Sequence, residues 1–142
     1  MKWMLMTLTL TLTLLTLCFC CLLSACGCTQ NIAFDVSIKD PTGKAVAGAT
    51  VRVSCQDLAG GDHAATGMSD GNGAATVRVV APSRDCPKDG RYISEYFGAC
   101  TLTVERQGLQ PATRTLLGTE IDAIDTHDEA GHHAKIDFVL AP

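Results

Sequence analysis

Large aromatic side chains are scarce in this sequence, which has one tryptophan, two tyrosines and four phenylalanines among 142 residues. The tryptophan, Trp3, lies in an apolar run at the N-terminus. The chain beyond that run therefore has only five aromatic residues, namely Phe34, Tyr92, Tyr96, Phe97 and Phe138. A small domain with so few large side chains buries limited apolar area, and it gains from covalent cross-links.

Basic residues are also few, because 11 lysines and arginines face 15 aspartates and glutamates, for a formal net charge of −4. Lys2 is the only charged residue among the first 25, so the chain that follows has a formal net charge of −5. A negative domain repels phosphate groups. This argues against nucleic acid and against anionic lipid headgroups as partners of the domain itself.

The N-terminal segment has the features of an export signal. It begins with Met1 and Lys2, continues as an apolar run to Leu23, and ends in small residues. Its last residues and the next one, Leu23-Ser24-Ala25-Cys26, resemble the lipobox of bacterial lipoproteins. The resemblance implies that residues 1–25 are a signal peptide, that cleavage falls before Cys26, and that the Cys26 sulfur carries diacylglycerol.

Two other interpretations of this segment remain open. Residues 3–23 contain no charge, and about 20 apolar residues suffice to span a bilayer, so the segment could be an uncleaved anchor. Plain secretion without lipidation is the second alternative.

Eight cysteines occur in the chain. Three lie in the expected signal peptide and Cys26 is the expected lipidation site, which leaves Cys28, Cys55, Cys86 and Cys100. An even number of cysteines in an exported domain predicts two disulfides, with three possible pairings. These four cysteines contain no Cys-x-x-Cys pair, which argues against a zinc site or thioredoxin-like chemistry.

Short alternations of apolar and polar residues follow, without an extended helical period. The pattern predicts strands over residues 34–38, 50–55, 64–69, 75–79, 100–104, 112–117 and 136–140. Loops are expected over 56–62, 82–90 and 118–131, with room for one helical turn within 91–98. Pro111 places the strand over 112–117 at a sheet edge.

Turn signals separate the strands. Asp40-Pro41-Thr42-Gly43 predicts a turn, and Asp70-Gly71-Asn72-Gly73 predicts a tight hairpin. Seven short strands at near-regular spacing predict an all-β fold, a seven-stranded sandwich of two sheets.

The order of these segments resembles the carboxypeptidase regulatory-like domain, a transthyretin-like (prealbumin-like) sandwich. The resemblance is carried by the Asp-x-x-Gly turn at 40–43, by Val46-Ala47-Gly48-Ala49-Thr50-Val51, and by the signature at 69–73. It covers roughly residues 32–141. It implies a fold and no reaction, because the family has no common catalytic residues.

The transthyretin-like arrangement pairs the second strand with the fifth and the first with the fourth, both antiparallel. It therefore implies disulfides Cys55–Cys100 and Cys28–Cys86, although Cys86 could instead reach Cys100 or Cys55. The domain is expected over 32–142, after a lipid tether at 26–31 that spans under about 20 Å. The domain should therefore stay close to its membrane.

Residues 120–133 contain five carboxylates and three histidines without a lysine or arginine. Imidazole and carboxylate are ligands for zinc, nickel or copper. Yet the spacing matches no established site, and the neighbours His132 and His133 would point to opposite faces of a strand. We expect a solvated acidic loop, and we assign no metal ligand and no cofactor.

Two enzyme families have related sandwiches. Hydroxyisourate hydrolases end in Tyr-Arg-Gly-Ser, whereas residues 139–142 are Val-Leu-Ala-Pro. Intradiol dioxygenases bind iron through two tyrosines and two histidines. Tyr92, Tyr96, His132 and His133 offer these residue types, but the adjacent histidines lack the alternate spacing. We expect no enzyme activity and assign no catalytic residue.

These features together predict a membrane-anchored bacterial envelope lipoprotein whose sandwich is a non-catalytic binding or scaffold module. Its partner would be an envelope protein engaged through loops or an edge strand. Gly27, not aspartate, follows the lipid site, as in lipoproteins of the outer membrane that face the periplasm. Two alternatives are the anchoring lipoprotein of a type VI secretion complex and a metal- or small-ligand-binding lipoprotein.

Overall fold

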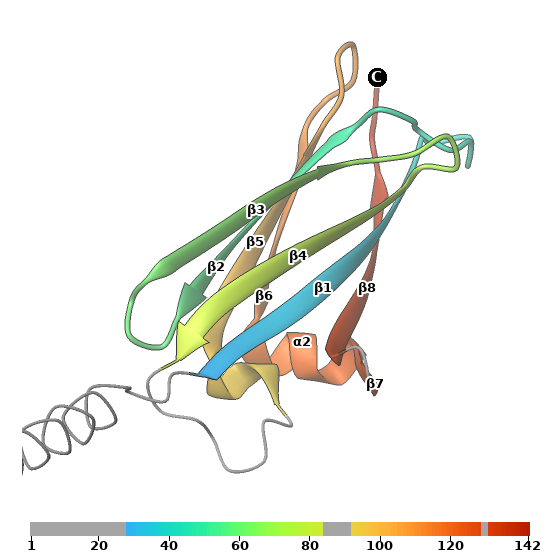
Figure 1. The fold of residues 1–142 in the computed structure, drawn as a ribbon. Coiled ribbons are helices and arrows are strands. Elements are labelled where there is room, and N and C mark those ends of the chain that lie inside the picture. Colours follow the sequence, from blue (N-terminus) through green and yellow to red (C-terminus); the bar gives the residue numbers. More distant parts are fainter. Residues whose placement is uncertain (1–27, 84–91, 129–130) are drawn as a thin grey trace, which may run out of the picture.

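Two four-stranded sheets pack face to face in the computed structural model, which describes residues 28–83, 92–128 and 131–142 (Figure 1). The expected all-β, two-sheet sandwich is therefore confirmed. The expected signal peptide at 1–25, Cys26 and Cys86 lie outside the described residues.

Each sheet has its own strand order, and two short helices lie at one end. The first sheet has the order β4-β1-β8-β7 and the second β3-β2-β5-β6. The elements are β1 (Cys28–Lys39), β2 (Thr50–Asp57), β3 (Asp62–Met68), β4 (Ala74–Ser83), η1 (Ile93–Glu95), β5 (Phe97–Glu105), β6 (Ala112–Leu117), α2 (Gly118–Ile124), β7 (Asp125–Asp128) and β8 (Gly131–Val139). No helix in the described residues is long and apolar enough to cross a bilayer.

The expected pairings are present. β2 is antiparallel to β5, β1 is antiparallel to β4, and β6 lies at a sheet edge. The single helical turn expected within 91–98 is η1. The last strand, β8, runs parallel to β1, with Ile32 opposite His132 and Lys39 opposite Val139.

The prediction that residues 118–131 form an unpatterned loop is wrong. They include α2 and β7, so the sheets formed by the described residues have eight strands. The Leu117 N–H donates to the Glu120 carboxylate at 2.7 Å where α2 begins, and Ile121 is fully buried. A helix of seven residues is two turns long, which is too short to show a helical period in the sequence.

The first strand begins earlier than expected. β1 starts at Cys28, and its backbone pairs with β4 from Cys28 opposite Ser83 onward. Residues 28–31, expected to be tether, are therefore part of the sandwich. The tight hairpin expected at 70–73 is a turn between the sheets, because β3 and β4 belong to different sheets.

Three connections use the same turn, in which an aspartate caps the backbone and a glycine follows three residues later. Each carboxylate accepts hydrogen bonds from the backbone N–H groups two and four residues ahead, at 2.7–3.0 Å. Each glycine has a positive φ, which side chains disfavour. The pairs are Asp40 with Gly43, Asp57 with Gly60, and Asp70 with Gly73.

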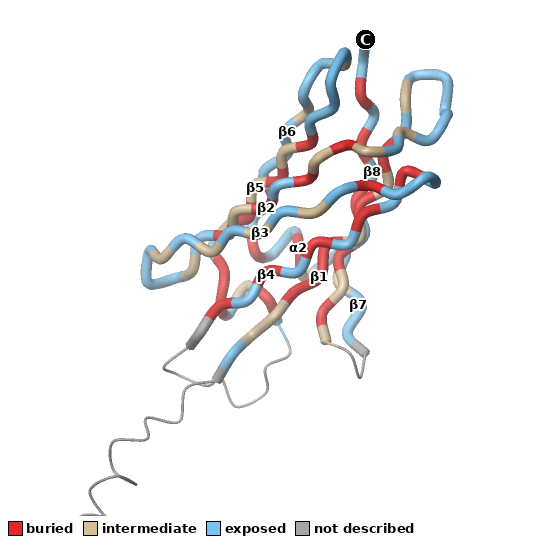
Figure 2. Tube along the Cα trace, turned by 45° about the horizontal axis from the view of Figure 1, so that its top comes forward, coloured by how far each residue is buried: buried red, intermediate tan, exposed pale blue. Residues whose placement is uncertain are grey.

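Alternation along the strands places the core between the sheets, and Figure 2 shows buried and exposed residues alternating along the chain. Phe34 and Phe97 are the largest fully buried side chains. Most of the remaining core consists of aliphatic side chains, among them Ile32, Val36, Ile38, Val51, Val53, Ile93, Leu102, Val104, Ile121, Ile136 and Leu140.

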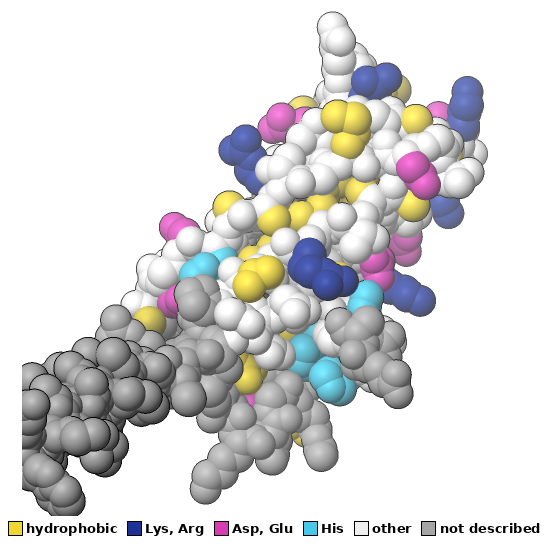
Figure 3. All heavy atoms as spheres, in the orientation of Figure 1, with side chains coloured by type: hydrophobic (Ala, Val, Ile, Leu, Met, Phe, Trp, Pro, Cys, Tyr) yellow, Lys and Arg dark blue, Asp and Glu magenta, His cyan; other side chains and the backbone are white. Residues whose placement is uncertain are grey.

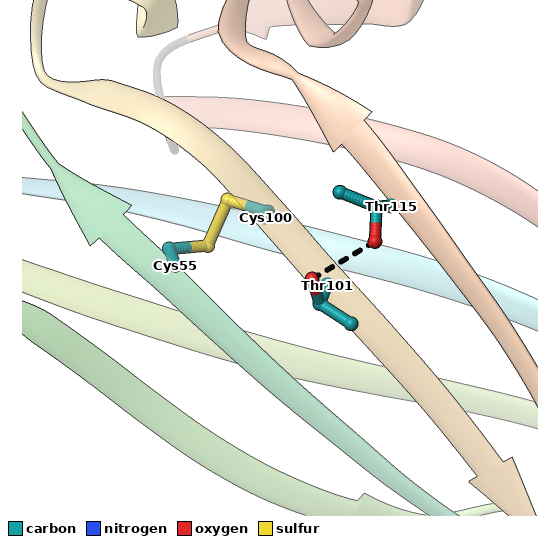
Figure 4. The surroundings of a disulfide bond; sticks show 4 residues. All are labelled: Cys55, Cys100, Thr101 and Thr115. Atoms are coloured by element: carbon teal, nitrogen blue, oxygen red, sulfur yellow. Dashed lines mark hydrogen bonds between the residues drawn. A yellow bond between two sulfur atoms is a disulfide. The ribbon is translucent and has the colours of Figure 1, made fainter.

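A disulfide joins Cys55 and Cys100 inside this core, as the transthyretin-like resemblance implies (Figure 4). The two residues lie opposite each other on β2 and β5, and both are fully buried. Thr101 points to the other face, where its hydroxyl lies 3.0 Å from the Thr115 hydroxyl. The second implied disulfide joins Cys28 to Cys86, and Cys86 lies outside the described residues.

Replacing Gly73 by alanine should destabilise the fold by about 3 kcal/mol or more. The residue has φ +73°, and an added Cβ would lie 2.4 Å from the Ile38 carbonyl oxygen and 3.1 Å from the Val46 nitrogen. Urea unfolding measures the effect. Gly71→Ala is the matched control, because no heavy atom lies within 4 Å of its Cβ position. Equal stability of both variants would contradict this account.

Replacing both Cys55 and Cys100 by alanine should lower the free energy of unfolding. The disulfide closes a loop with a sequence separation of 45, for which the chain-entropy model gives about 4 kcal/mol. Chemical unfolding without reductant measures the loss. A double variant as stable as the parent protein would show that the cross-link does not stabilise this core.

Candidate functional site

One end of the sandwich gathers both helices and most of the ionisable side chains that contact each other. We call it the helical end; it comprises η1, α2, β7, the turn at 58–61 and the strand ends beside them. β1 begins at this end, and the C-terminus lies at the other (Figure 1). Figure 3 shows histidines mainly toward the helical end and lysines and arginines mainly away from it.

The β7–β8 hairpin brings two histidines and an aspartate together. His127 lies opposite His132, and their ring centroids are 4.4 Å apart. His132 is only 1% exposed, and its Nδ1 is hydrogen-bonded to the nearly buried carboxylate of Asp125. A buried imidazole needs such a partner, because desolvation without hydrogen bonds is costly.

A line of hydrogen bonds continues from this hairpin across the whole first sheet. The other Asp125 oxygen accepts from the backbone N–H of His133 at 2.8 Å. The His133 Nδ1 lies 3.2 Å from Asp35 on β1, and Asp35 also accepts from the Thr76 hydroxyl on β4 at 2.7 Å. These contacts link all four strands of the sheet, and the step from Asp125 to β8 runs through the backbone N–H of His133.

His132 and His133 point to opposite faces of β8, as expected for neighbours on a strand, since one is buried and the other partly exposed. Among the residues that the structure describes, no group of three or more histidine, cysteine, aspartate or glutamate side chains is arranged to hold a metal ion.

Another carboxylate joins the two helices. Asp122 on α2 accepts hydrogen bonds from the backbone N–H groups of Ile93 and Ser94, at 2.6 and 3.2 Å, and from the Ser94 hydroxyl. Ile93 and Ile121 are fully buried beneath this contact. Asp122 and these two buried side chains therefore join η1 to α2.

Asp57 and His63 form a further pair at this end, with 2.8 Å between Oδ2 and Nε2. The His63 hydrogen bond is the main cause that lowers the pKa of Asp57 below its ordinary value of 3.8, and the Gly61 backbone N–H adds to it. The His63 ring meets Phe97 edge-on, with 6.2 Å between centroids. The pair thus fastens the β2–β3 turn to β5.

The two tyrosines flank η1 in different environments. Tyr92 is 51% exposed, whereas Tyr96 is buried. Burial is the main cause that raises the pKa of Tyr96 above its ordinary value of 10.0, so its phenol is held neutral.

The sequence singled out the histidines and carboxylates of 120–133, Asp125 among them, but it did not connect them with Asp35. Asp35 stands almost 100 positions before His133, and only the parallel pairing of β1 with β8 brings the two together. The alternation of 34–38 did signal that Asp35 faces outward. Cys26, the expected lipidation site, is followed two residues later by the start of β1 at this end.

No protein-family model and no curated protein sequence matches this chain. Solved structures do resemble it. Chlorocatechol 1,2-dioxygenase from Pseudomonas putida has 18% identity and a TM-score of 0.59, over 80% of this chain and 61% of that one. 3-Chlorocatechol 1,2-dioxygenase from Rhodococcus opacus 1CP has 16% identity and a TM-score of 0.55, over 79% and 60%.

Catechol 1,2-dioxygenase from Acinetobacter sp. ADP1 has 14% identity and a TM-score of 0.55, over 79% of this chain and 52% of that one. This chain thus spans between about half and three fifths of those enzymes. At such low identity the likeness shows a shared β-sandwich fold, and it carries no function with it.

The iron ligand set of intradiol dioxygenases does not fit the residues found here. The two histidines lie on opposite faces of β8, so their rings do not converge on one metal ion. We therefore derive no reaction step through iron.

Replacing Asp57 by asparagine should lower the free energy of unfolding at neutral pH. It should also make that free energy change less as the pH falls into the acid range. The folded-state pKa of Asp57 is lowered, so the stability it adds is present above its ordinary pKa and is lost as the pH falls through the folded value. Urea unfolding from pH 7 to pH 2 should show the gap between variant and parent closing below the ordinary pKa of 3.8. Asp137→Asn, at an exposed position on β8, is the control; a gap that stays constant with pH would refute the role of the ionised carboxylate.

Proposed function

We propose that this protein is a lipid-anchored bacterial envelope protein whose carboxypeptidase regulatory-like sandwich is a non-catalytic binding or scaffold module. The observation that carries the proposal is the sequence Leu23-Ser24-Ala25-Cys26 followed directly by a folded strand. In this interpretation residues 1–25 are removed, Cys26 is acylated, and the sandwich hangs from the outer membrane into the periplasm.

The polar groups of the helical end support a structural role for that end. Asp122 joins the two helices, and Asp125 fixes the β7–β8 hairpin. Carboxylates and imidazoles engaged with each other in this way hold the fold, whereas acid–base chemistry needs such a group directed at a substrate. The resemblance to dioxygenases extends to the fold alone.

An edge strand offers a way to bind a protein partner. At one side of the sandwich β3 and β4 lie close together, because a Cβ on Gly67 would be 2.9 Å from the Val77 side chain. At the other side β6 is the edge strand next to β5, and Thr113, Arg114 and Thr115 are exposed on it. A partner that adds a strand to β6 would gain backbone hydrogen bonds along six residues.

Replacing Cys26 by alanine should abolish acylation and shift the protein from the membrane fraction. The parent protein should begin at Cys26 and carry diacylglycerol, because only a cysteine provides the sulfur that is alkylated. Mass spectrometry of the purified N-terminal peptide measures this directly. Cys21→Ala, within the expected signal peptide, is the matched control and should leave acylation intact.

Two results would overturn the proposal. An unmodified Cys26 inside a longer mature chain would remove the lipid anchor. Oxygen consumption by the purified protein with catechol and ferrous iron would contradict the proposal that the sandwich is a non-catalytic module.

A further inference from the structure

Apolar side chains are exposed preferentially at the helical end. Of the seven large hydrophobic residues that are exposed in the described part of the chain, four belong to this end. They are Leu58 (65% exposed) in the β2–β3 turn, Tyr92 (51%) before η1, Leu117 (56%) before α2, and Ile124 (36%) at the end of α2.

Backbone contacts place these four residues around one surface. The Leu58 N–H donates to the Tyr96 carbonyl beside η1, at 3.1 Å. Leu117 lies opposite Ala99 at the start of β5. Asp122 ties α2 to η1, which joins Ile124, the last residue of α2, to the segment in which Tyr92 directly precedes η1. The exposed apolar groups therefore surround the end of the sandwich instead of scattering over its sides.

The position of the lipid site indicates what covers this surface. Cys26 precedes the start of β1 by two residues, which span at most about 7 Å. β1 begins at the helical end, so an acyl group on Cys26 would hold this end against the bilayer. This step rests on the proposed lipid anchor.

Charge indicates how the contact is made. The described side chains of the helical end include aspartates and glutamates and no lysine or arginine. Among these described residues, the side chains suited to enter the bilayer interface are therefore the apolar and aromatic ones.

We propose that the helical end rests on the lipid surface, with Leu58, Tyr92, Leu117 and Ile124 in the bilayer interface. The molecule then stands upright on the membrane. The opposite end, with Lys39, Lys44 and Arg106, faces the aqueous compartment, and the β6 edge runs between the two.

Single tryptophans test this orientation. The only native tryptophan, Trp3, is lost with the signal peptide, so each variant of the mature protein has one reporter. Leu58→Trp and Leu117→Trp place it at the helical end. Met68→Trp and Val139→Trp, at positions 68% and 61% exposed at the opposite end, are matched controls.

The acylated variants are reconstituted in phosphatidylcholine vesicles with and without brominated acyl chains. Tryptophan at 58 and 117 should show a blue-shifted emission and severalfold stronger quenching by the brominated lipid than tryptophan at 68 and 139. Added salt should change the quenching little, because the contact is apolar. Circular dichroism confirms that each variant is folded.

Mass spectrometry of the same samples tests the lipid anchor on Cys26 separately from the orientation of the helical end on the bilayer. If Cys26 is acylated and the four tryptophans are quenched equally or not at all, the orientation is wrong and the lipid anchor stands. If Cys26 is unmodified, the anchor fails and the orientation argument fails with it.

Discussion

The pairing of β2 with β5 is the constraint on which the rest of the sandwich depends. In this ladder every second residue faces the core, so a shift by one residue would expose the whole apolar set. The buried disulfide between Cys55 and Cys100 holds the two strands in one register. This matters in a core with few aromatic side chains, where packing alone contributes less.

The same register positions the helical end. β5 begins at Phe97, directly after η1, and β6 leads into α2. Once β5 is fixed, Asp122 can join α2 to the backbone at Ile93 and Ser94. The carboxylates of the helical end therefore join elements whose positions follow from the pairing of β2 with β5. In this way a core with few aromatic side chains supports an ordered surface.

The likeness to catechol dioxygenases illustrates why a fold does not determine a function. The sandwich is shared at identities of 14–18%, yet His132 and His133 lie on opposite faces of one strand and serve different partners. One ring is buried against Asp125 and the other meets Asp35 across the sheet. The function of such a scaffold depends on what lies at its ends and edges, which is where the proposed lipid contact and strand addition are located.

Local patterns in the sequence determined much of the fold. Alternating residues identified the strands that became β1 to β6 and β8, and Pro111 indicated the edge position of β6. The turns at 40–43 and 70–73 were readable because aspartate caps the backbone and glycine accepts positive φ. Only the tertiary structure decided the rest. It assigned α2 and β7, which are too short to show a period of their own, and placed Asp35 beside His133 through pairing between strands at opposite ends of the chain. Such contacts depend on how distant segments meet, and no window of neighbouring residues contains that information.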